Sequence, residues 1–151
     1  MKVREDFLPL NRPSIGNAEI ESVVACLKSG WITTGPQCRT FEEKFCELTG
    51  AARAVTVTSA TAGMHLLLMA MGIGPGDEVI TPSMTFASTV NMIAMLGASP
   101  VFVDVEYDTL NIDAGLVEQA VSSRTKAIIP VHFAGAPADM DRITGVADRH
   151  N

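Results

Sequence analysis

Alternation of short strand-like segments with helical segments is the sequence feature that most restricts the fold of this chain. Short strands joined by helical crossovers form a mainly parallel sheet with helices on both faces. The sequence therefore predicts an α/β fold. Strands are expected at about 54–58, 78–81, 101–105 and 126–131, and helices at about 61–71, 85–96 and 114–121, with a last helix from about 140.

Local signals set the expected ends of these helices. Apolar residues at helical spacing predict two further helices, which Gly30 and Gly50 should end as C-caps. Asp113 is expected to be an N-cap. The helix over 61–71 has apolar residues on all its sides, so it is expected to be buried nearly all round.

Composition excludes several functional classes. The chain has 151 residues, of which 47% are hydrophobic and 19% charged, which is typical of one folded domain. A net charge of −6 disfavours nucleic acid as a partner, and no apolar run is long enough to span a membrane. The beginning of the chain lacks the features of a signal peptide. The three cysteines match no metal or redox motif, so we expect reduced thiols, no metal and a cytoplasmic location.

The connection between the first expected strand and the helix that follows it consists of residues with small side chains. Residues 59–63 read Ser-Ala-Thr-Ala-Gly, and the helix begins among them. Amides at a helix N-terminus bind phosphate well, and small side chains allow a ligand to approach the backbone. An ordinary Ser/Thr cap on a crowded turn explains the same residues. From the sequence pattern alone, both interpretations stay open.

Four stretches of the chain together resemble the DegT-type nucleotide-sugar aminotransferases, which are pyridoxal phosphate (PLP) enzymes of fold type I. The resemblance covers nearly the whole chain and is strongest to the branch that makes UDP-4-amino-4-deoxy-L-arabinose. It implies the N-terminal part of the PLP-binding large domain over residues 1–151. The stretches are SGWITTGP (29–36), SATAGMHLLLMAM (59–71), GDEVITPSMTFAST (76–89) and TKAIIPVHFAGAPADMD (125–141).

The same resemblance implies roles for particular residues. The backbone amides of Ala60, Thr61 and Ala62 would hold the PLP phosphate, and Phe86 would stack on the PLP ring. A core phenylalanine is the alternative for Phe86. Thr33 and Thr34 would border the sugar-nucleotide site, although 32–36 also reads as a plain connection between helices.

His132 also has two interpretations. It ends an expected strand on the ligand-binding edge, so it could lie near the cofactor. It could equally form hydrogen bonds with carbonyl oxygens of the neighbouring loop. The sequence offers no Ser-His-Asp arrangement and no set of metal ligands.

The catalytic groups of the family are not found in this sequence. Transamination requires a lysine that holds PLP as a Schiff base, and Lys2, Lys28, Lys44 and Lys126 all lie at unsuitable positions. We therefore expect a fragment that is inactive alone and that belongs to a larger homodimeric enzyme of cell-envelope or lipopolysaccharide amino-sugar synthesis. The resemblance implies glutamate and a nucleotide-linked 4-keto sugar as substrates. Alternatives are a PLP-dependent keto-deoxy-sugar dehydratase of the same family, or a non-catalytic truncated binding protein.

Overall fold

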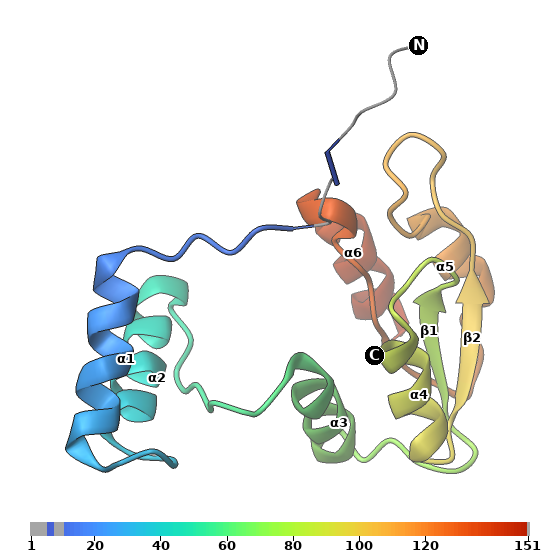
Figure 1. The fold of residues 1–151 in the computed structure, drawn as a ribbon. Helices are drawn as coiled ribbons and strands as arrows, with labels where there is room; N and C mark the ends of the chain where they lie inside the picture. Colours follow the sequence, from blue (N-terminus) through green and yellow to red (C-terminus); the bar gives the residue numbers. More distant parts are fainter. Residues whose placement is uncertain (1–5, 8–10, 151) are drawn as a thin grey trace. The chain divides into compact units, whose positions relative to one another are not determined.

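The computed structural model describes residues 6, 7 and 11–150, and the chain divides into two compact units between Thr56 and Val57. The first unit contains helices α1 (Asn17–Ser29) and α2 (Pro36–Thr49) (Figure 1). Gly30 and Gly50 end these helices with left-handed backbone, which confirms both predicted C-caps. Neither helix has a buried residue.

The second unit is built on a parallel sheet in the order β2-β1-β3 (Figure 1). This arrangement confirms the predicted α/β class. The Asp113 side chain accepts hydrogen bonds from the Gly115 and Leu116 amides, as expected of an N-cap. The strands are β1 (Glu78–Pro82), β2 (Ser99–Val103) and β3 (Thr125–Ile128), and the helices are α3 (Ala60–Ala70), α4 (Ala87–Met95), α5 (Ala114–Ala120), the short 3₁₀ helix η1 (Phe133–Gly135) and α6 (Met140–His150).

The predicted strand over 54–58 is wrong. None of the described strands pairs with this segment, and strand propensity cannot replace a hydrogen-bonded neighbour. Instead, the Thr56 backbone N–H and its hydroxyl both donate to Glu42 Oε1 at 2.7 Å. The hydrogen bond from the Thr56 backbone is the main cause that lowers the pKa of the Glu42 carboxyl.

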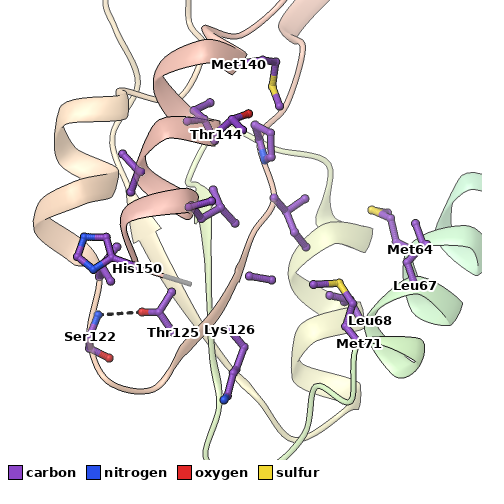
Figure 2. A pocket seen from close by; sticks show the side chains of 18 of the residues that line it. Met64, Leu67, Leu68, Met71, Ser122, Thr125, Lys126, Met140, Thr144 and His150 are labelled. Atoms are coloured by element: carbon purple, nitrogen blue, oxygen red, sulfur yellow. Dashed lines mark hydrogen bonds between the residues drawn. The ribbon is translucent and has the colours of Figure 1, made fainter. Parts of the chain in front are cut away.

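One face of the sheet packs against α4 and part of α3. Val79 and Ile93 are fully buried there, together with Leu68 from α3. The expectation that α3 is buried nearly all round is wrong, since Leu68 is its only buried residue. Apolar side chains of α3 instead border a groove of about 850 Å³, whose other walls are β3 and α6 (Figure 2).

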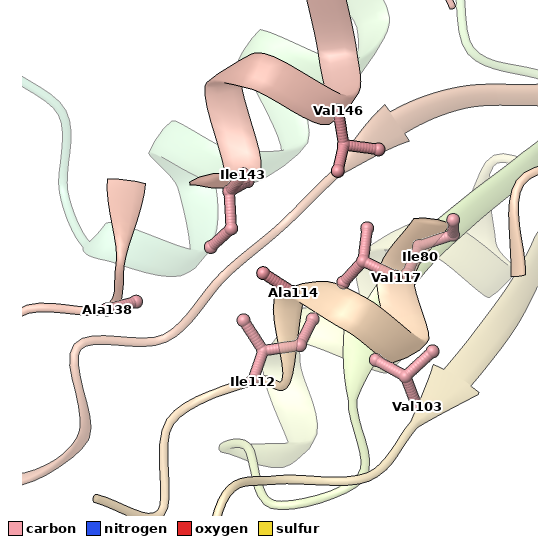
Figure 3. Packing of buried hydrophobic residues seen from close by; sticks show 8 residues of the cluster. All are labelled: Ile80, Val103, Ile112, Ala114, Val117, Ala138, Ile143 and Val146. Carbon is pink, nitrogen blue, oxygen red and sulfur yellow. The ribbon is translucent and has the colours of Figure 1, made fainter. Parts of the chain in front are cut away.

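The opposite face packs against α5 and α6. Ile80 and Val117 are fully buried, and Ile143 and Val146 of α6 point toward them (Figure 3). Because successive strand residues point to opposite faces, Val79 and Ile80 contribute to different cores. Two separate cores therefore hold β1, whose residues are all buried.

Polar groups at the amino end of the sheet are paired within the chain. The buried Glu78 carboxylate accepts hydrogen bonds from the Ser122 hydroxyl and the Arg124 guanidinium. In the preceding turn, the Gly74 N–H donates to Asp77 Oδ2 at 3.0 Å. These polar groups at the amino end of the sheet therefore have hydrogen-bond partners within the chain.

Candidate functional site at the carboxyl end of the sheet

The starts of α3 and α4 lie close together near the carboxyl end of β1. The Thr85 hydroxyl donates to Thr89 Oγ1 at 2.9 Å, and the Thr89 hydroxyl lies 3.9 Å from Met64 Sδ. Thr89 is buried in the first turn of α4, and Met64 lies in the second turn of α3. The carboxyl edge of a parallel sheet is where ligands bind in open α/β folds.

The first turn of α3 contains the three residues predicted to bind phosphate. Ser59 is its N-cap, and the Ser59 hydroxyl oxygen accepts from the Ala62 N–H at 3.1 Å. The Ala60 and Thr61 N–H groups have no hydrogen-bond partner among the described residues. The cap interpretation is therefore correct for Ser59, yet it leaves two amides available to an anion at the positive end of the helix dipole.

The glycine in this turn is not required by the packing of the chain. A Cβ added to Gly63 would lie 3.6 Å from Val57 Cγ2, which is an ordinary van der Waals contact. Gly63 also has no left-handed backbone. The glycine at position 63 thus has no steric cause within the described residues.

Phe86 lies at the N-cap of α4, next to the end of β1. Its side chain is 80% exposed, so the alternative of a core phenylalanine does not describe it. A large apolar ring that is exposed at a ligand-binding edge is available for stacking. Its contact with a cofactor ring stays a prediction.

The loop after β3 is held by a buried asparagine that the sequence analysis missed. Asn111 is 3% exposed, and its side-chain amide donates to the carbonyl oxygens of Ala136 and Pro137 at 3.2 and 3.0 Å. Its Oδ1 atom accepts from the Phe133 N–H at 2.9 Å. No local signal could identify this role, because the partners lie more than 20 residues away.

His132 lies in this loop and is hydrogen-bonded within it, but its partner is a backbone N–H and not the carbonyl oxygens that one interpretation expected. The Ala138 N–H donates to His132 Nδ1 at 3.0 Å. The other ring nitrogen, Nε2, forms no hydrogen bond with a described residue, and the side chain is exposed.

Thr33 and Thr34 belong to the first unit, in the connection between α1 and α2. Both are exposed, and the Thr34 carbonyl oxygen accepts from Trp31 Nε1 at 2.9 Å. Gly35 is required here, since a Cβ at this position would lie 2.1 Å from the Trp31 ring. A tightly packed connection explains these residues, and their contact with a substrate stays a prediction.

Among the described residues, neither a metal-ligand cluster nor a membrane-spanning helix is found. No group of three or more His, Cys, Asp or Glu side chains is arranged to hold a metal ion. None of the helices in the described part has the length and hydropathy needed to cross a bilayer.

Comparison with known families decides the membership of the chain. Residues 13–151 match the model of the DegT/DnrJ/EryC1/StrS aminotransferase family. The chain belongs to this family. The resemblance predicted from the four sequence stretches is confirmed.

Solved structures of similar proteins agree with this membership. A Streptococcus pneumoniae protein assigned as a sugar aminotransferase, solved in PLP, pyridoxamine phosphate (PMP) and apo forms, is 44% identical, with a TM-score of 0.88. That match covers 94% of this chain and 36% of the other. An aminotransferase from Psychrobacter cryohalolentis is 37% identical with a TM-score of 0.88, and the match covers 95% of this chain and 37% of that one. The chain therefore spans little more than a third of these relatives.

Proposed function

We propose that this chain forms the N-terminal part of the PLP-binding large domain of a nucleotide-sugar aminotransferase. The complete enzyme would move an amino group from glutamate to the C4 keto group of a nucleotide-linked sugar. Family membership supports the reaction class, and the three solved forms of the pneumococcal relative support the cofactor. The single observation that carries the proposal is the pair of unpartnered amides, Ala60 and Thr61, at the start of α3.

The residues at the carboxyl end of the sheet fit a phosphate-bearing cofactor. The Ala60 and Thr61 amides donate to phosphate oxygens, and the Thr61 hydroxyl adds a third donor. Ala62 contributes by sharing its N–H between the Ser59 oxygen and the phosphate. Gly63 adds no side chain to this turn, and the exposed Phe86 ring would stack on the cofactor ring.

When bound, PLP supplies an electron-withdrawing ring that makes amino-group transfer possible. This chain would contribute by anchoring the phosphate at the start of α3 and by orienting the ring through stacking with Phe86. Thr33 and Thr34 would border the sugar-nucleotide site. We further propose a cytoplasmic homodimer as the working form of the enzyme, acting in cell-envelope polysaccharide synthesis.

The chain alone should bind the cofactor without turning over. Lys126 lies near the amino end of β3, at the edge opposite to the proposed site, and Lys28 and Lys44 belong to α1 and α2 of the first unit. Within the second unit, the described residues therefore offer no lysine suited to hold the cofactor covalently or to carry a proton at the substrate. We expect no PMP formation from PLP and glutamate by these 151 residues.

Replacing Ala60 with proline tests the proposal with little damage to the helix. Ala60 is the first residue of α3, where proline is favoured, and Ser59 before it is extended (φ −163°, ψ 161°), which proline requires. Ala60→Pro removes one donor to a charged oxygen, worth about 1.5–3 kcal/mol. PMP affinity measured by calorimetry should therefore fall by about tenfold or more.

Asn17→Pro is the matched control. Asn17 is the first residue of α1, it is exposed, and Gly16 before it is also extended. This variant should bind PMP as the unchanged chain does. Equal PMP affinity of Ala60→Pro and Asn17→Pro would contradict the proposed phosphate site.

A further inference from the structure

The loop over 132–138 is mostly exposed, yet hydrogen bonds from the buried Asn111 side chain hold its backbone in place. It contains two consecutive residues with left-handed backbone, Ala134 (φ 51°) and Gly135 (φ 84°), and the first of them is unfavourable for a residue with a Cβ. Asn111 compensates for this with three hydrogen bonds that use both of its donors and its acceptor. A buried side chain with all its hydrogen bonds formed specifies one loop conformation.

This loop conformation fixes the protonation of the His132 ring. The Ala138 backbone N–H can only donate, so His132 Nδ1 must present a lone pair to it. The neutral ring must then carry its proton on Nε2, which lies on the side of the ring away from that hydrogen bond. Nε2 is left without a partner among the described residues.

We propose that Asn111 is a positioning residue that holds the loop 132–138 so that His132 offers its Nε2–H group as a hydrogen-bond donor to an oxygen of the bound ligand. The inference rests on the proposed function, because that function places a ligand at the carboxyl end of β1 and β3. The acceptor is an oxygen of the cofactor, which belongs either to its phosphate or to its ring. A donor whose tautomer is set in advance loses little entropy when it binds an acceptor.

The first test measures the tautomer in the 151-residue chain labelled with ¹⁵N at histidine. At a pH above 8, where imidazoles are neutral, long-range ¹H–¹⁵N spectra distinguish protonation at Nδ1 from protonation at Nε2. His132 should be protonated at Nε2. Asn111→Asp should reduce the Nε2–H population without altering His132 itself, because the two donors to Ala136 and Pro137 are lost. An Nδ1–H tautomer in the unchanged chain would overturn the proposal.

The second test adds inorganic phosphate or PMP to the same sample. A shift of His132 Nε2 with phosphate alone identifies the phosphate as the acceptor, whereas a shift with PMP only identifies a ring oxygen. Either result supports the proposal. If the Thr61 amide shifts with PMP and Nε2 does not, the role of His132 is overturned while the proposed function stands. If neither group shifts at saturating PMP, both are overturned.

A pair of substitutions separates the donor from the structural role of the ring. In His132→Asn, the side-chain oxygen can accept from the Ala138 N–H in place of Nδ1, but no donor reaches the position of Nε2. PMP affinity should fall by about three- to tenfold, the value of one hydrogen bond, while the Ala138 amide signal stays in place. In His132→Gln, the longer side chain restores a donor near the Nε2 position and should recover part of the affinity. Unchanged PMP affinity in His132→Asn would contradict the proposal.

Discussion

The two ends of the sheet in the second unit both use small residues, but for different reasons. At the amino end, Gly72 and Gly76 have left-handed backbone (φ 72° and 94°), and the turn pairs its polar groups through Asp77. At the carboxyl end, Gly63 has neither a left-handed backbone nor a close neighbour, and the Ala60 and Thr61 amides stay unpaired. The amino-end turn is explained by the chain itself, whereas the carboxyl-end turn has unpaired amides and open space that fit the phosphate of the proposed ligand.

The largest expected difference in stability between the two ends appears when one glycine of each turn is replaced by alanine. Gly76→Ala forces a Cβ into left-handed backbone, so it should lower the free energy of unfolding by about 1–2 kcal/mol. Gly63→Ala lies within a helix and has room, so it should leave that energy unchanged or raise it by up to about 1 kcal/mol. Urea unfolding followed by circular dichroism measures both. An equal loss of stability in the two variants would remove the distinction between the two ends.

A smaller effect is expected from Phe86→Ala, which tests the carboxyl end as a binding surface. Because the ring is 80% exposed, its removal should change the free energy of unfolding little. PMP affinity should fall by about fivefold, since stacking contributes about 1 kcal/mol. Tyr107→Ala is the control, because Tyr107 is a 93% exposed aromatic outside the proposed site. Equal PMP affinities of these two variants would show that the Phe86 ring does not contact the cofactor.

The smallest expected effect is a pH dependence of the hydrogen bonds between Glu42 and Thr56, which precedes the carboxyl-end turn in the sequence. The pKa of Glu42 is lowered by its hydrogen bonds with Thr56, so these bonds stabilise the fold above the ordinary glutamate pKa. That stabilisation should be lost as the pH falls through the lowered pKa of the folded state. The Thr56 amide chemical shift should follow this titration with a midpoint below 4.5. A midpoint at or above that value, or no titration at Thr56, would contradict the hydrogen bonds.

Signals carried by nearby residues predicted the helices well. Gly30 ends α1, and Asp113 caps α5, because each acts on backbone groups within a few residues. The residue pattern predicted a helix that begins near Thr61, and Ala60, Thr61 and Ala62 are found in its first turn. Local chemistry was therefore sufficient for helix boundaries and for the position of the candidate phosphate turn.

Properties that depend on distant partners could not be predicted in the same way. The segment 54–58 has a strand composition but no described strand beside it, and α3 has apolar residues on sides that the rest of the second unit does not cover. The role of Asn111 depends on a loop more than 20 residues further along the chain. The sequence shows which residues are able to pair or to be buried, and the tertiary structure decides whether they do.

The most direct test of the account is a titration of the ¹⁵N-labelled chain with PMP, followed at backbone amides. The account predicts that the Ala60 and Thr61 amide signals shift at saturation, because they bind the phosphate, while those of Gly74 and Gly76 at the amino-end turn stay in place. Shifts at Gly74 and Gly76, or anywhere else, with Ala60 and Thr61 unchanged at saturating PMP would contradict it.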